Sequence, residues 1–228
     1  MDAVAYLLDE EVEGDEKRVE NSPWWRISHA LGFITGGTTF IAGTWYLYLP
    51  STEETSFLSS LLYIIGSVGF LYVDVLEFFT FTEDFFLRCN IAISAAGSFF
   101  YVIGSCGFLP QFPSLPSNFS TPLVGDWGFI LGSILIGCSQ VWKLVRIGWD
   151  KAGGYSPLHN FSSKEVGTST GVEGGACVGA WCFFVGTVLY LLYPVTLLQV
   201  VLWTWMVGSI FFTLGGFFLA YRHFVMGV

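Results

Sequence analysis

Long hydrophobic runs, separated by short polar segments, dominate the chain. An α-helix needs about 20 residues to cross the roughly 30 Å apolar core of a bilayer. Six runs approach or exceed that length, at 27–49, 57–79, 89–109, 127–145, 175–193 and 197–221. Apolar residues follow one another directly within them, as in 91–96 and 197–206, instead of alternating with polar ones as in a transmembrane barrel strand. The pattern predicts an all-α integral membrane protein with six transmembrane helices.

The composition and the distribution of charge support this prediction and add an orientation. Hydrophobic residues make up 53% of the chain and charged residues only 12%, which is too few to cover a water-soluble domain. Six crossings would place all nine basic residues on one side of the membrane and none on the other. By the positive-inside rule, we expect both termini to be cytoplasmic. The basic residues are Lys17, Arg18, Arg26, Arg88, Lys143, Arg146, Lys151, Lys164 and Arg222.

One five-residue element occurs once in each of the six runs. It consists of an aromatic residue, two apolar residues, a glycine and a serine or threonine, at 40–44, 63–67, 101–105, 129–133, 183–187 and 205–209. Small residues line helix contacts in membranes, and an adjacent hydroxyl can bond within or between helices. The alternative is that the six hydroxyl-bearing elements line a polar path. The glycines predicted to pack helices are Gly43, Gly66, Gly104, Gly132, Gly186 and Gly208.

The recurrence of this element in pairs predicts three tandem helical hairpins. Hairpin 1 covers 25–80, hairpin 2 covers 85–147 and hairpin 3 covers 175–225. Residues 1–24 hold eight acidic residues and are expected to form an acidic cytoplasmic tail. Residues 148–174, rich in Gly and Ser, are expected to form a linker on the inner side.

The second hairpin resembles the small YrhK-like membrane domain. The resemblance covers 90–147, where the element at 101–105 leads through a loop to the element at 129–133 and then to Lys143 and Arg146. Residues 198–224 look like the second half of another copy. The resemblance implies two-helix units without established chemistry, and it supplies no catalytic residue.

Three ionisable residues form a candidate site for a proton or cation. Asp74 and Glu77 lie three residues apart, and therefore on one helix face, near the inner end of the second run. His29 enters the first run at a similar height. Ionisable groups at such depth are costly, which makes a functional role a reasonable hypothesis. The alternative, which we favour at this level, is structural ion pairing with basic residues at similar positions, namely Lys143, Arg146 or Arg222.

Other chemistry is sparsely represented. Two of the three histidines, His159 and His223, fall in segments expected to be soluble, so no metal site is predicted. The phosphate-loop, zinc-protease and serine-hydrolase motifs are absent, so neither an enzyme nor a cofactor is expected. Asn118, in Asn118-Phe119-Ser120 on the charge-free side, is a candidate glycosylation site.

These observations favour a structural or accessory membrane subunit without catalytic activity. Its expected partners are membrane lipids and other membrane subunits or copies of itself, and nucleic acid is not expected. The first alternative is a small solute or ion transporter or channel with a carboxylate site near the inner face. The second is a pigment- or lipid-binding membrane protein.

Overall fold

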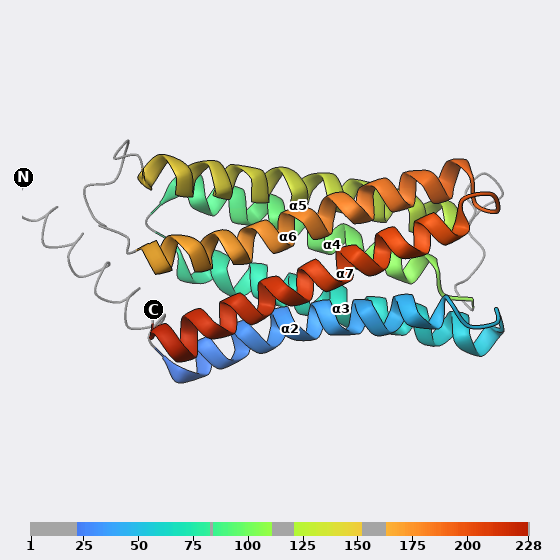
Figure 1. Cartoon of the computed structure of the whole chain (residues 1–228), viewed down its shortest axis with the longest axis horizontal. Helices are drawn as coiled ribbons and strands as arrows, with labels where there is room; N and C mark the ends of the chain where they lie inside the picture. Colours follow the sequence, from blue (N-terminus) through green and yellow to red (C-terminus); the bar gives the residue numbers. More distant parts are fainter. Residues whose placement is uncertain (1–21, 83, 111–120, 152–162, 228) are drawn as a thin grey trace, which may run out of the picture.

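The computed structural model describes residues 22–82, 84–110, 121–151 and 163–227. Most of these residues lie in six long helices, and no strand occurs among them. The predicted all-α fold is therefore confirmed (Figure 1). The helices are α2 (Pro23–Tyr46), α3 (Glu53–Thr80), α4 (Phe85–Gly107), α5 (Thr121–Lys151), α6 (Ser163–Leu192) and α7 (Leu198–Tyr221), and the π-helix η1 (Arg222–Met226) extends α7.

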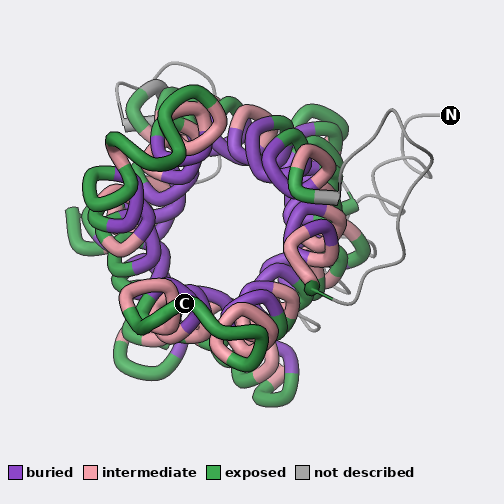
Figure 2. Tube along the Cα trace, turned by 90° about the vertical axis from the view of Figure 1, so that its right-hand side faces the viewer, coloured by how far each residue is buried: buried purple, intermediate pink, exposed green. Residues whose placement is uncertain are grey.

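The six helices form a closed ring. Each helix packs against the next one in the chain, and α7 packs against α2 to complete the circle. Figure 2 shows the ring end-on, with the buried residues of every helix facing its centre. The centre is filled by side chains, which form one continuous hydrophobic core.

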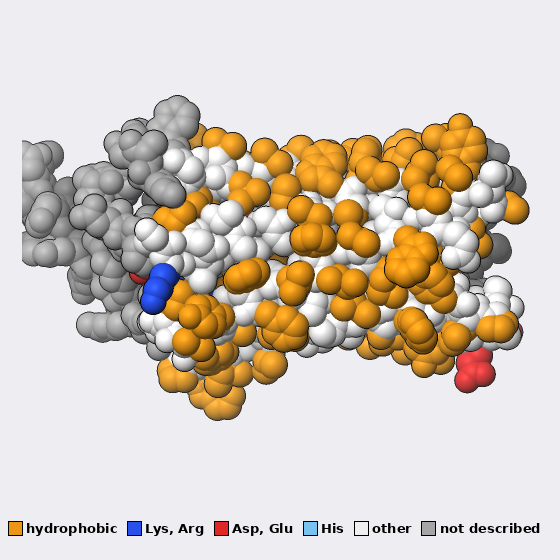
Figure 3. Space-filling view, in the orientation of Figure 1, with side chains coloured by type: hydrophobic (Ala, Val, Ile, Leu, Met, Phe, Trp, Pro, Cys, Tyr) orange, Lys and Arg blue, Asp and Glu red, His pale blue; other side chains and the backbone are white. Residues whose placement is uncertain are grey.

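The outer surface of the ring suits a bilayer. Helices α3 to α7 are each long and apolar enough to cross a membrane. Four glycines and four threonines make α2 less apolar, but it runs beside α3 and α7 over much of their length, so we expect it to cross with them. Figure 3 shows apolar side chains along the helices on one face; basic side chains are visible near one end only, whereas acidic atoms are visible near both ends. We call these the basic end, where α3, α5 and α7 end, and the opposite end.

The contact between α2 and α7 depends on small residues. A β-carbon on Gly37 would lie 2.6 Å from the backbone nitrogen of Thr213, and one on Gly216 would lie 3.2 Å from the Cα atom of Ile34. At the basic end, Arg26 donates hydrogen bonds to the carbonyl oxygens of His223 and Gly227, at 3.3 and 3.1 Å. Close backbone approach and these bonds join the first and last described helices.

Within each hairpin, the predicted packing glycines receive aromatic rings from the partner helix. The exchange is reciprocal: the ring of Phe40 on α2 fills the space beside Gly66 on α3, and the ring of Tyr63 on α3 lies beside Gly43 on α2. The same exchange pairs Tyr101 with Gly132 and Phe129 with Gly104, and then Phe183 with Gly208 and Trp205 with Gly186. The aromatic residue and the glycine of the recurring element thus serve one packing arrangement.

Phe40 is the centre of the aromatic core. Its ring is fully buried and lies within 6.4 Å, centroid to centroid, of rings from all five other helices. Aromatic pairs at such separations add stability beyond the burial of their area. The rings contacted are Tyr63 and Phe70 of α3, Tyr101 of α4, Phe129 of α5, Phe183 of α6 and Phe212 of α7. These rings fill the middle of the ring of helices.

The six hydroxyls of the recurring element are also buried inside the ring. Four of them, on Thr44, Ser67, Ser105 and Ser209, donate to the carbonyl oxygen of the aromatic residue four positions earlier. The other two contact aromatic side chains, because Ser133 bonds to Tyr101 Oη at 2.8 Å and Thr187 accepts from Trp205 Nε1 at 3.3 Å. The hydroxyls therefore satisfy groups of the protein itself within the core.

The predicted linker at 148–174 is wrong at both ends. Helix α5 continues to Lys151, and α6 begins at Ser163, twelve residues before the predicted span. Packing overrides the weak helix propensity of Gly and Ser here: a β-carbon on Gly171 would lie 2.7 Å from the ring of Phe218, so α7 covers this first part of α6 closely. At the N-terminus, Pro23 and Trp24 belong to α2, whereas the rest of the predicted acidic tail, up to residue 21, lies outside the described residues.

Candidate functional site

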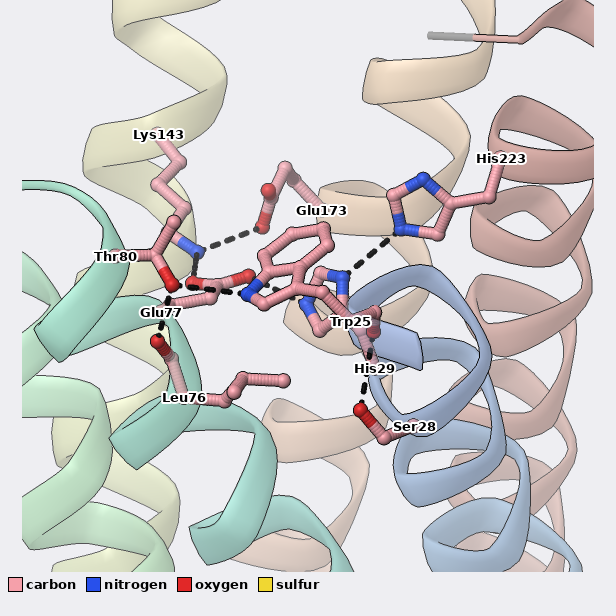
Figure 4. Close-up of polar contacts among 9 residues, drawn as sticks. All are labelled: Trp25, Ser28, His29, Leu76, Glu77, Thr80, Lys143, Glu173 and His223. Carbon is pink, nitrogen blue, oxygen red and sulfur yellow. Dashed lines mark hydrogen bonds and ion pairs between the residues drawn. The ribbon is translucent and has the colours of Figure 1, made fainter. Parts of the chain in front are cut away.

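A group of connected polar side chains lies inside the ring, toward the basic end. We call it the polar cluster; Figure 4 shows its members, which come from four helices, α2, α3, α5 and α6, and from the η1 extension of α7. Their side chains are largely withdrawn from both lipid and water, and relative exposure is 15% for Glu77, 11% for Lys143 and 19% for Glu173. The members are Trp25, His29, Glu77, Thr80, Lys143, Glu173 and His223.

Glu77 is the central acceptor of the cluster. One carboxylate oxygen lies 3.0 Å from Nε2 of His29, and the other lies 3.3 Å from Nζ of Lys143. Glu77 therefore connects α3 to both α2 and α5. An ionised carboxylate only accepts hydrogen bonds, so Nε2 of His29 must carry the hydrogen in this arrangement.

Lys143 has a second carboxylate within reach. Its ammonium nitrogen lies 3.6 Å from Glu173 of α6, in addition to its contact with Glu77. A buried ammonium with two carboxylates keeps a partner when either carboxylate becomes neutral. Lys143 can therefore form an ion pair with either Glu77 or Glu173.

His29 and His223 are in direct contact. Nδ1 of His29 lies 2.9 Å from Nε2 of His223. With Nε2 of His29 bonded to Glu77, a neutral His29 accepts at Nδ1 from His223, whereas a protonated His29 donates there. Transfer of that proton from Nδ1 of His29 to Nε2 of His223 moves a positive charge from one ring to the other. The pair has the geometry of a short proton relay.

Trp25 covers the two histidines. Its ring centroid lies 4.5 Å from that of His29 and 5.5 Å from that of His223, and the residue is only 6% exposed. Its indole nitrogen donates to Thr80 Oγ1 at 2.9 Å. Trp25 therefore ties α2 to the end of α3 and shields the relay at the basic end.

Asp74 belongs to a separate branch. It is buried, and it accepts a hydrogen bond of 2.5 Å from Ser98 Oγ on α4. Of the predicted trio, the structure joins His29 directly to Glu77, whereas the carboxylate of Asp74 bonds to α4 instead.

The basic residues proposed as ion-pair partners have different positions. Lys143 pairs with Glu77, whereas Arg146 pairs with Asp84 at 2.8 Å in a partly exposed bridge. Arg222 interacts electrostatically with Glu173. Glu77 therefore has one of the ion-pair partners suggested from the sequence, Lys143, and is also in contact with His29.

Two ionisable members of the cluster, Glu173 and His223, were not predicted from the sequence. The assignment of His223 to a soluble segment is wrong, because η1 carries it back over the ring, where it is 7% exposed. Glu173 was placed in a linker that is in fact helix. A usable signal existed: counted back from the glycine of the recurring element, His29 lies fourteen residues before Gly43 and Glu173 thirteen before Gly186, so they share a height in the ring.

Asn118 lies outside the described residues. Within the part of the chain that the structure describes, no three His, Cys, Asp or Glu side chains are grouped so that they could hold a metal ion.

The fold and the cluster together define an all-α membrane protein with a closed ring of helices, an aromatic core and a buried group of charged side chains toward one end. Comparison of the chain with known protein families, with curated proteins and with solved structures found no match. The functional argument therefore rests on the geometry of this chain.

Proposed function

We propose that the protein is a membrane transport protein in which the polar cluster takes up and releases a proton. The observation that carries the proposal is the position of Glu77, held between His29 and Lys143 inside the ring. Ionisable groups within membrane segments are costly and commonly mark ion or proton pathways. A purely structural ion pair would need two residues, whereas this cluster adds a second carboxylate and two histidines.

The contacts support a specific proton step. A proton that binds the Glu77 carboxylate makes it neutral, which removes its attraction for Lys143. Lys143 keeps its charge and remains paired with Glu173. The proton leaves Glu77 when a base on the other side of the membrane accepts it. The ion pair between Glu77 and Lys143 then forms again. Protonation of Glu77 on α3 is thereby linked to a shift of the Lys143 ammonium toward Glu173 on α6.

The accessory-subunit alternative loses one of its arguments. It was motivated by small-residue faces, by the many aromatic residues and by the lack of a convincing polar pathway, but the six glycines of the recurring element face aromatic rings of this same chain. What the ring offers to neighbours is an apolar outer surface of the kind that lipid also covers. We therefore rank transport first.

We also propose that the basic end faces the cytoplasm and that the ring consists of three YrhK-like hairpin units. The positive-inside rule supports the orientation, since basic residues are confined to one end of the described helices. The reciprocal exchange of rings and glycines within each hairpin supports the two-helix unit.

Proton flux into vesicles tests the proposed function. The full chain is reconstituted into liposomes that contain a pH-sensitive dye, and a potassium gradient with valinomycin sets the membrane potential. We expect proton uptake above that of protein-free vesicles, and a loss of about tenfold or more in Glu77→Gln.

Asp84→Asn serves as the matched control. It also neutralises a carboxylate at the basic end, but one that is partly exposed and bound to Arg146. Its flux should equal that of the wild type. Equal flux in Glu77→Gln and wild type, or no flux above protein-free vesicles in the wild type, would remove the support for the proposal.

A further inference from the structure

A pocket opens at the opposite end of the ring. Its volume is about 360 Å³, within the usual range for small-molecule sites. Aromatic side chains from α3, α5, α6 and α7 line its depth, and serines of α3 lie along one wall. We call it the serine-walled pocket; the residues that matter for its chemistry are Ser59, Ser60, Tyr63, Phe129, Phe183 and Trp205.

The polar groups of this pocket offer acceptors. Ser59 Oγ donates to the carbonyl oxygen of Gly43 at 2.9 Å, and Ser60 Oγ donates to carbonyl oxygens of Ser56 or Phe108 at the same distance. A hydroxyl has one hydrogen and two lone pairs, so both serines retain acceptor capacity but no free hydrogen.

The two aromatic side chains with donor groups, Tyr63 and Trp205, also donate their hydrogens to groups of the protein itself. Thr44 gives its hydrogen to the carbonyl of Phe40, so Tyr63 Oη is the donor in their 2.6 Å contact. Trp205 Nε1 donates to Thr187. A ligand meets hydroxyl oxygens and aromatic rings there, which favours a molecule that brings its own hydrogen-bond donors.

The charged residues near the opposite end are all acidic. The connecting segments 47–56, 108–125 and 193–197 contain no Lys or Arg, whereas Glu53, Glu54 and Asp126 are all near this end. Asp126 is 5% exposed, and its Oδ1 has no hydrogen-bond partner among the residues that the structure describes. It lies one helical turn before Phe129 on α5 and interacts electrostatically with Tyr190, which lines the pocket. A buried carboxylate oxygen without a partner favours a cation nearby.

We infer that the serine-walled pocket binds a small organic ammonium ion that carries an apolar group. The aromatic rings attract the cation by their faces, the serine oxygens accept its hydrogens, and Asp126 supplies the negative field. The apolar group fits the leucine and phenylalanine side chains of the lining.

This pocket is separate from the polar cluster. The aromatic core around Phe40 and Phe212 lies between the two, and no residue of the cluster lines the pocket. Ligand binding there does not depend on the proton step, so the inference stands or falls independently of the proposed transport.

Calorimetry with a defined probe tests the inference. The full chain in detergent micelles is titrated with 2-phenylethylammonium and, separately, with phenylacetate, which has a similar shape and the opposite charge. We expect the ammonium to bind and the carboxylate to give no measurable heat. Failure of the ammonium to bind, or equal binding of both probes, would overturn the assignment.

Matched variants locate the binding. Trp205→Leu removes a ring from the pocket, and Asp126→Asn removes the charge; each should weaken binding by about tenfold. The controls are Trp203→Leu, a lipid-facing tryptophan on the same helix, and Asp84→Asn at the basic end, and both should bind as wild type does.

A further pocket variant covers the case in which Trp205→Leu does not fold. Ser56 lines the pocket at the first turn of α3, and Ser56→Phe should fill the pocket without removing a core side chain. Unchanged binding in Ser56→Phe would place the ammonium elsewhere and refute the inference.

Discussion

The ring of Phe40 on α2 occupies the space that a side chain at Gly66 on α3 would need. The fit leaves no room, because the phenylalanine itself is enclosed by rings from every other helix. Each recurring element thus supplies an aromatic ring and a glycine, and the glycine leaves space for a ring of the partner helix. Substitution of either residue should therefore lower the stability of the whole core.

Gly66→Leu should prevent the native ring from forming. Its side chain would collide with a ring that cannot move aside, and overpacking of a filled core is destabilising. Thermal unfolding in detergent should show a large drop in midpoint or loss of the folded species. Gly174→Leu is the control, because no described residue has an atom within 4 Å of a β-carbon there, and its midpoint should stay close to the wild-type value. Partial recovery in Gly66→Leu combined with Phe40→Ala would establish that the two positions compete for one space.

Phe40→Ala alone should destabilise the protein by about 3–5 kcal/mol, the usual cost of removing a buried aromatic ring. Unfolding by denaturant in mixed micelles measures this. Phe217→Ala removes a ring from the lipid-facing side of α7, where exposure is 55%, and should cost much less. Equal effects of the two substitutions would contradict the central role of Phe40.

Lys143→Met should destabilise the protein more than the double variant Lys143→Met with Glu77→Gln. The single change leaves buried carboxylates without their counter-ion, a loss of about 3 kcal/mol or more, whereas the double change also removes one of the stranded charges. The comparison is a double-mutant cycle on unfolding free energies. Additive effects would show that the two groups are not coupled.

Trp25→Phe should retain the ring contact with His29 and lose the hydrogen bond to Thr80. The expected cost is about 1 kcal/mol, and Thr80→Val should give a similar value because it removes the same bond. Unfolding midpoints of both variants provide the measurement. A much larger effect of Trp25→Phe would mean that the indole has a further role in the cluster.

Labelling from the two sides of the membrane tests the six crossings. Single cysteines replace Lys164 and, separately, Glu53 in a variant without the five native cysteines. In intact cells, an impermeant thiol reagent should label position 53 and leave position 164 unlabelled until the cells are opened. The same pattern at both positions would exclude an odd number of crossings between them.

Much of the fold could be predicted because lipid imposes a simple rule on sequence. Apolar length identifies the spans, and the helices found lie within a few residues of most predicted ends. The start of α6 was missed because a helix can extend beyond the bilayer, where apolar length gives no information. Ring closure was also out of reach, because the pattern within a hairpin does not specify which hairpins are neighbours or that Gly37 meets Thr213.

The candidate site was predicted in part for similar reasons. Depth in the membrane brought attention to His29 and Glu77, and equal spacing from the glycine suggested Lys143 as a partner. Glu173 and His223 were hidden, since one follows a polar helical turn and the other lies just past the last apolar residue of its span. The sequence shows the aromatic residue of each recurring element. It does not show that these rings meet in one core, because that contact depends on the arrangement of all six helices.

The contact between α2 and α7 has a topological consequence. Since the first and last described helices are neighbours, residues 23 and 226 lie at the same end of the molecule, and Arg26 already reaches the backbone of residues 223 and 227. The helices follow one another around a circle. The contact between α2 and α7 is therefore of the same kind as the five contacts between consecutive helices. A circularly permuted chain, joined across these ends and opened between α5 and α6, would present the same six neighbours in the same cyclic sequence.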